Sequence, residues 1–134
     1  MAYDAELAVQ AAFYRALSDD RDDGVLVYEH VPDEAEPPFV VIDKVTLTNA
    51  AGKDGLLDFA EVDVVSFHVG AGREFMTPLM AENRRRVDGR PLTDPDGLAL
   101  LSAPAFVSSD SGVLDDAITY FGTQRFSLFV QPAD

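Results

Sequence analysis

A long β-hairpin is the feature of this sequence that most restricts its fold. Residues 39–48 are rich in β-branched side chains, and residues 57–69 favour a second strand. The segment 49–55 between them is small and turn-prone, so the two strands should pair as a hairpin. The alternation in the first strand predicts that one face carries Phe39, Val41, Val45 and Leu47.

The second strand of the hairpin leaves two interpretations open. Its apolar residues have both parities: Val62 and Val64 share one, and the other is shared by Phe59, Val65, Phe67 and Val69. Either both faces of the strand are partly covered, or a bulge shifts the phase near residues 64–65.

Two amphipathic helices flank the hairpin. Apolar residues recur at helical spacing over residues 4–18, and again over residues 76–87. The start of the second helix is open. Either Thr77 and Pro78 form its cap and first position, or Pro78 lies in the first turn of a helix that begins near Arg73.

The remaining segments favour strands. Residues 25–31 predict a short strand, and residues 98–108 and 117–130 predict two more around a turn at Ser109–Gly112. The order is α-β-β-β-α-β-β. We therefore predict a single domain over residues 1–134 with an α+β fold, in which two helices pack on one face of a single antiparallel or mixed sheet.

The composition excludes several classes of protein. Ten Lys and Arg residues stand against 24 Asp and Glu residues, which gives a net charge of −14. A surface with this charge repels phosphate backbones and disfavours DNA binding. The absence of cysteine excludes disulfides, thiol catalysis and cysteine-ligated metals. No apolar run approaches the roughly 20 residues that cross a bilayer, so we expect no membrane span, and we find no sign of export.

The histidines and the acidic loop do not form a recognisable catalytic or metal-binding motif. His30 and His68 are the only imidazoles, and Asp63, five residues before His68, has the opposite parity on the predicted strand. Residues 19–23 offer oxygen ligands for calcium, but their spacing departs from the calcium-loop pattern and favours a solvated turn. Residues 70–72 lack the spacing of a phosphate-binding loop. We therefore predict no enzymatic activity, no metal and no cofactor.

Five segments carry a resemblance to a known family, and they cover nearly the whole chain: Leu7–Ala12, Tyr28–Pro32, Pro37–Ile42, Val62–Val69 and Arg125–Val130. Their order and character resemble the tail-terminator (tail-completion) family of long-tailed bacteriophages, which also occurs in phage-derived gene transfer agents. The proline-aromatic-β-branched strand is the most specific of these segments. This chain departs from the family pattern in its longer helix over residues 76–87, which includes an arginine run, and in the loop 90–97.

The resemblance implies a structural virion protein. Six subunits of such a protein form a ring on the head-proximal end of the tail tube, end tube polymerisation and offer a docking surface to the head connector. The implied partners are five further copies of the chain, the major tail tube protein and the connector or stopper protein. DNA passes through the lumen without specific binding, and carboxylates on the lumen wall would repel it. The implied location is the tail neck, with assembly in the host cytoplasm.

Protruding polar elements are the expected contact sites of such a ring. The sheets of neighbouring subunits are expected to meet side by side. The hairpin tip, the arginine run and the turn before the last strand supply the candidate interface residues, which are Asn49, Lys53, Asp54, Arg84, Arg85, Arg86, Ser109 and Asp110.

Two alternatives remain. One is another neck or head-tail connector protein of the same particle. The other is a small α+β ligand-binding module or enzyme that uses His68 or His30.

Overall fold

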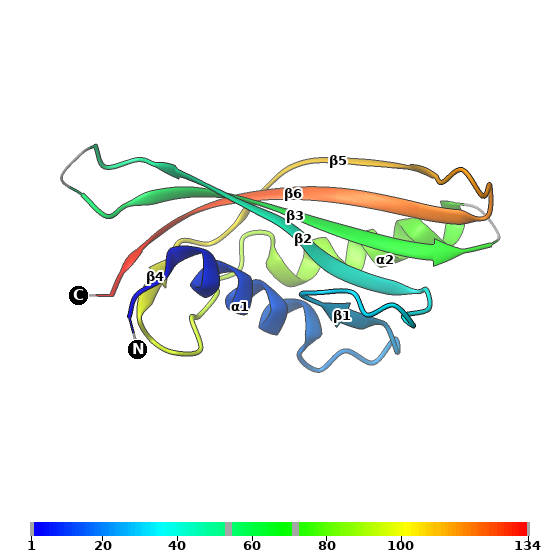
Figure 1. The fold of residues 1–134 in the computed structure, drawn as a ribbon, viewed down its shortest axis with the longest axis horizontal. Coiled ribbons are helices and arrows are strands. Elements are labelled where there is room, and N and C mark those ends of the chain that lie inside the picture. The colour runs from blue at the N-terminus through cyan, green and yellow to red at the C-terminus, as the bar shows by residue number, and fades with distance from the viewer. Residues whose placement is uncertain (1, 53–54, 71–72, 134) are drawn as a thin grey trace.

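The computed structural model describes residues 2–52, 55–70 and 73–133 (Figure 1). It confirms the α+β class and the predicted order of helices and strands, with one predicted strand divided in two. The elements are α1 (Ala5–Ser18), β1 (Leu26–Tyr28), β2 (Phe39–Asn49), β3 (Asp58–Val69), α2 (Arg73–Val87), β4 (Ala99–Leu101), β5 (Ala105–Val113) and β6 (Thr119–Pro132).

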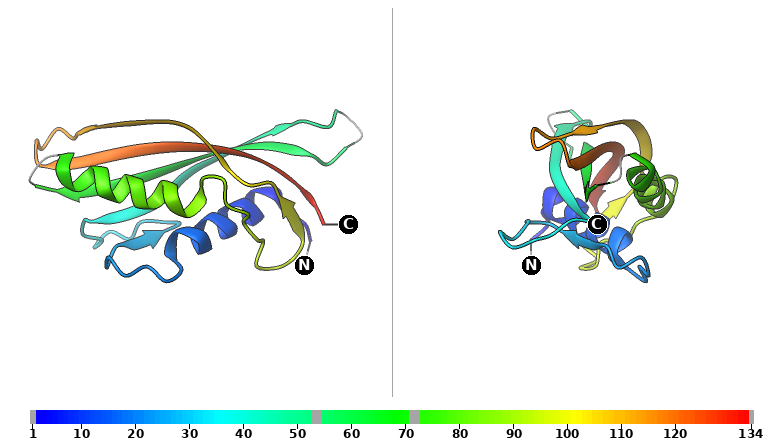
Figure 2. Two further views of the ribbon diagram at one scale, coloured as in Figure 1. Left: turned by 180° about the vertical axis from the view of Figure 1, so that it is seen from behind. Right: turned by 90° about the vertical axis from the view of Figure 1, so that its right-hand side faces the viewer.

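The strands form one mixed sheet. Its order is β1-β2-β3-β6, and both β4 and β5 pair with the far side of β6. Only β1 and β2 run parallel to each other, whereas the other pairs are antiparallel. Both helices lie on the same face of the sheet, as the views from the front and from behind show (Figure 1, Figure 2). The other face, which we call the open face, has no helix on it.

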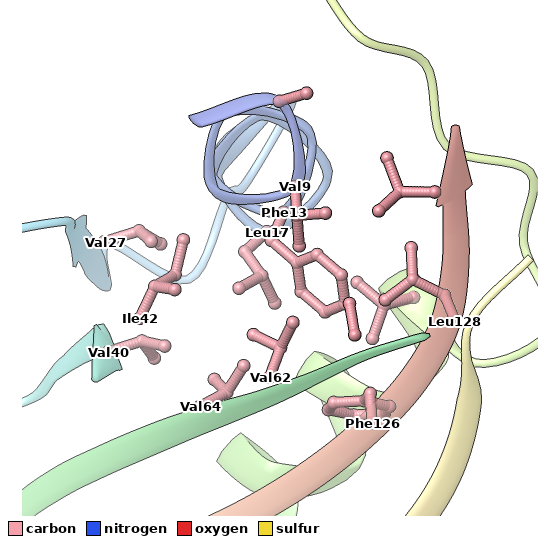
Figure 3. Close-up of a cluster of buried hydrophobic side chains, with 14 of the residues drawn as sticks. Val9, Phe13, Leu17, Val27, Val40, Ile42, Val62, Val64, Phe126 and Leu128 are labelled. Atoms are coloured by element: carbon pink, nitrogen blue, oxygen red, sulfur yellow. The ribbon is translucent and has the colours of Figure 1, made fainter. Parts of the chain in front are cut away.

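The hydrophobic core lies between the helices and the sheet (Figure 3). Asp4 caps α1, because its carboxylate accepts the N–H of Leu7 at 3.0 Å. The helix then buries an apolar stripe against β3 and β6, made up of Val9, Phe13 and Leu17. Gly122 of β6 allows α2 to approach closely, since a Cβ at this position would overlap the sulfur atom of Met80. Neither helix is long and apolar enough to cross a membrane.

The prediction for the first hairpin strand was wrong in its facing. Phe39 and Val41 lie on the open face, whereas Val45 and Leu47 pack against the core on the helix side. The cause is an irregularity in β2 at Asp43, where the register with β3 shifts by one residue. Such a bulge turns every following side chain to the opposite face.

The two interpretations of β3 are now resolved. This strand pairs with β6 without a register shift, so the bulge lies in β2 instead. Its even-numbered residues from Ala60 to Ser66 are buried beneath the helices. Its aromatic residues are half-buried on the open face, where the ring of Phe67 lies 5.1 Å from that of Phe39 and the ring of Phe59 lies 5.4 Å from that of Phe129. Both faces of β3 are therefore partly covered.

The predicted turn at Ser109–Gly112 is part of strand β5. These four residues pair with residues 121–124 of β6, and the actual turn spans residues 114–118. In that turn, the carboxylate of Asp116 accepts the N–H groups of Ile118 and Thr119 at 3.0 and 2.8 Å. Small polar residues favour turns in isolation, but pairing along β6 overrides this preference. The predicted strand over residues 98–108 is broken around Pro104 into β4 and β5.

Helix α2 begins at Arg73, in agreement with the second of the two predicted starts. Pro78 nevertheless lies in the second turn and not in the first, so it cannot donate to the carbonyl of Glu74. The hydroxyl of Thr77 donates to the carbonyl of Arg73 at 3.1 Å in this same region. The helix therefore tolerates a proline at the cost of one backbone hydrogen bond.

Candidate functional site

The arginine run at the end of α2 divides into one structural residue and two surface residues. Arg86 is only 11% exposed and donates to the carbonyls of Ala16, Asp19 and Asp20 at 3.3, 2.5 and 3.4 Å. These carbonyls lie at the C-terminal end of α1, where a helix leaves its last carbonyls without partners. Arg86 therefore joins the two helices by capping α1.

Arg84 and Arg85 keep half or more of their side chains exposed, at 50% and 59%. Arg84 lies over the ring of Phe106, 3.8 Å from its centroid, and pairs with Asp88 at 3.1 Å. Arg85 pairs with Glu82 at 2.6 Å. Contacts within the same chain thus hold both guanidinium groups in place. The exposed part of each side chain is still accessible to a partner.

A series of hydrogen-bonded polar side chains lies beneath the contact between the end of α1 and helix α2. The amide of Asn83, which is fully buried, donates to the hydroxyl of Ser66 at 2.8 Å and accepts from Arg21 at 3.0 Å. Arg21 also donates to the carboxylate of Asp23 at 2.9 Å. These hydrogen-bonded side chains link the loop after α1 to α2 and β3. The pattern of the sequence places Asn83 on the apolar stripe of α2 but gives no sign of its partners.

The hairpin tip projects beyond the helices at one end of the molecule (Figure 1). The side chain of Asn49 accepts the N–H groups of Ala51 and Gly52 at 2.9 and 3.0 Å, which shapes the start of the turn. Lys53 and Asp54 lie outside the described residues. Leu56 is 68% exposed, so this projection presents an apolar side chain as well as polar ones.

Three of the predicted interface residues lie along one groove. The groove runs between α2 and β5, has a volume of about 400 Å³, and is lined in part by Arg84, Ser109 and Asp110. Arg85 lies elsewhere on α2, and Asn49 lies at the hairpin tip. The structure thus groups some of the predicted residues around β5 and separates the others from them.

His68 lines a pocket of about 390 Å³ that Asp23 and Glu82 also line, but among the described residues no hydrogen bond reaches its Nδ1 atom. His68 stacks on the ring of Phe75 with 5.0 Å between ring centroids. Asp63 pairs with Arg125 on the open face at 2.8 Å, so it does not orient His68. His30 is exposed in the loop after β1. Across residues 2–52, 55–70 and 73–133, no group of three or more acidic or histidine side chains is arranged to hold a metal ion.

Two carboxylates make the fold sensitive to acid. Burial opposes ionisation of Asp23, but hydrogen bonds from Arg21 and the N–H of Val25 outweigh it and hold the pKa of this carboxyl below its ordinary value. For Glu82, the hydrogen bond from Arg85 lowers the pKa, burial opposes it, and Arg86 lowers the pKa further.

We therefore expect the free energy of unfolding to decrease as the pH falls below about 4–5, because a carboxyl with a lowered pKa in the folded state stabilises the fold only while it is ionised. Urea unfolding at several pH values measures this. The variant Asp23→Asn should be less stable at neutral pH and should lose less stability between pH 5 and pH 3. An unchanged pH dependence in this variant would contradict the assignment to Asp23.

Comparison with known proteins finds a similarity in fold but none in sequence family. No protein-family model matches the sequence, and no curated protein matches it. A solved structure of the virion of a native gene transfer agent (GTA) particle contains a similar chain. The two chains superpose with a TM-score of 0.81 at 18% sequence identity, and the match covers 97% of this chain and 99% of the other. At this identity, the likeness shows a shared fold.

Proposed function

We propose that this chain is a structural virion protein without enzymatic activity, and that it is the tail terminator of a phage or gene transfer agent. Residues 1–134 would act as a single domain. Six copies would form a ring on the head-proximal end of the tail tube, end its polymerisation and present a docking surface to the head connector. The observation that carries the proposal is the full-length similarity in fold to a chain of a gene transfer agent virion.

The physical properties of the chain are consistent with this role. A cap requires one face that matches the tube end and another that does not propagate it, and it requires no chemistry. The net charge of −14 suits a ring through which DNA passes, because a carboxylate-rich lumen repels phosphates. A basic lumen in a structure of the ring would contradict this part of the proposal.

A second candidate is another neck protein of the same particle, which would act one layer nearer the head. The same similarity in fold supports it, because a neck protein is also a component of a virion. The two candidates differ in their effect on the tube: a terminator controls its length, whereas a connector does not.

Deletion of the gene in the producing strain distinguishes these functions. Tail lengths are measured by negative-stain electron microscopy. For a terminator we expect overlong tails without heads, because nothing stops the addition of tube protein. Tails of normal length without heads would assign the chain to the connector, and intact infectious or transducing particles would favour a ligand-binding module or an enzyme. Complementation with Arg85→Glu and Lys53→Glu tests the predicted interface: unchanged tail joining would exclude these two residues.

A further inference from the structure

The two outer edges of the sheet are unpaired in the described part of the chain. On one side, β5 pairs with β6 and with no other strand. The N–H of Phe106 donates to the carboxylate of Asp88 at 3.1 Å, so the outer edge of β5 that remains free is Ser108–Val113. On the other side, β1 covers only residues 39–41 of β2, which leaves the outer edge of Lys44–Asn49 free. Within residues 2–52, 55–70 and 73–133, no other strand runs along the outer side of β5 (Figure 1). Free edges with unpaired N–H and C=O groups are templates for pairing with another chain.

The topology fixes the direction in which these edges would meet. Successive strands β2, β3, β6 and β5 alternate in direction, because each adjacent pair is antiparallel. When a second copy lies beside the first in the same orientation, β5 of one copy is therefore antiparallel to β2 of the next. The free edge of β2 begins at Lys44, just beyond the residues that pair with β1. A strand from a neighbouring copy can therefore pair with this edge on the same side of β2 as β1, without overlapping it.

The side chains of the two edges can also lie on matching faces of a shared sheet. The pairing through β3 and β6 places Lys44, Thr46 and Thr48 on the open face. The pairing with β6 places Ser108, Asp110 and Gly112 on that same face. A register with Thr48 opposite Ser108 and Thr46 opposite Asp110 keeps all of these side chains on one face, as a continuous sheet requires.

The charges favour unlike edges over like edges. Lys44 is the only cationic residue of β2, and Asp110 is the only charged residue of β5. Antiparallel pairing of two β5 edges would place the two Asp110 carboxylates directly or diagonally across from each other, because Asp110 lies near the middle of the free edge. In the register above, Lys44 instead lies diagonally across from Asp110, within reach of a long side chain.

We propose that the outer edge of β5 binds the Lys44–Asn49 edge of β2 in a second copy of this chain. The contact is heterologous, since it joins two different surfaces, and it closes into a ring when the rotation per subunit allows. This inference rests on the ring in the proposed function and specifies which strands join its subunits.

Cysteine crosslinking tests the contact without background, because the chain has no cysteine of its own. The double variant Thr48→Cys/Ser108→Cys is treated with a short bismaleimide, both as purified chain and in cells that assemble the particle. We expect a ladder of multimers, because each copy offers both edges. The two single variants should remain monomeric when treated separately and should yield only dimers when mixed.

Charge exchange is the second measurement. In the double-cysteine background, Lys44→Asp should reduce the crosslinked fraction severalfold through repulsion from Asp110, and Lys44→Asp/Asp110→Lys should restore it. Melting temperatures confirm that each variant is folded. The absence of a ladder both in the purified chain and in assembling cells would overturn the edge contact, as would dimers of the single variant Ser108→Cys. Tail length after gene deletion tests the terminator function separately, so the two proposals can fail independently.

Discussion

Replacement of Asn83 by alanine is expected to lower the free energy of unfolding by about 2.5–4 kcal/mol, the typical sum for one buried hydrogen bond to a charged group and one neutral hydrogen bond. Asn83 is fully buried and bridges the hydroxyl of Ser66 and the guanidinium of Arg21. The side chain of Arg21 is only 3% exposed, so water cannot easily replace the lost acceptor. Urea unfolding of the purified variant measures the change.

A double-mutant cycle identifies the cause of this loss. Arg21 keeps its bonds to Asp23 and to the carbonyl of Leu17 when Asn83 is removed, but it loses the amide acceptor. The double substitution removes this donor and its acceptor together, so Arg21→Met/Asn83→Leu should lose less stability than the sum of the two single substitutions. Asn49→Ala serves as a control on an exposed asparagine at the hairpin tip and should change stability by about 1 kcal/mol or less. Strict additivity of the two single effects would show that the two side chains act independently.

Replacement of Arg86 by alanine is expected to cost about 2–3 kcal/mol, because charged hydrogen bonds to three carbonyls at the end of α1 are lost from a site that is almost closed to water. The packing of the arginine stem against both helices is lost as well. The melting temperature should fall by about 10 °C for a chain of this size. Scanning calorimetry or circular dichroism measures this shift.

The neighbouring residue provides a matched control. Arg85 lies on the same helix and contacts the same Glu82, but its side chain is 59% exposed. Exposed ion pairs contribute little, so Arg85→Ala should change the free energy of unfolding by less than about 1 kcal/mol. Equal effects of the two substitutions would show that the capping of α1 by Arg86 is not what stabilises the contact between the helices.

Local patterns in the sequence were sufficient for the elements of the fold. The helical spacing over residues 4–18, the β-branched strand over residues 39–48 and the alternation over residues 117–130 each predicted an element close to its observed position. These patterns report directly on which side chains must avoid water, so periodicity is reliable for long amphipathic segments. The order of helices and strands followed from them, and so did the α+β class.

Facing and pairing were decided by the tertiary structure. The bulge at Asp43 reverses the facing of Val45 and Leu47, and no local pattern signals a single extra residue in a strand. Ser109–Gly112 favours a turn on its own but forms a strand because β6 offers it partners. Tertiary contacts also separate the three residues of the arginine run. Three consecutive residues look alike in sequence, yet only Arg86 points to the end of α1.

The candidate site divides in the same way. The sequence alone determined that this chain is an acidic α+β protein without cysteine, and its residues indicated where polar elements would reach the surface. Only the tertiary structure placed Arg84, Ser109 and Asp110 along one groove and left the edges of β5 and β2 unpaired. A free edge arises from the absence of a neighbouring strand, and that absence is a property of the whole sheet, which no local segment of sequence encodes.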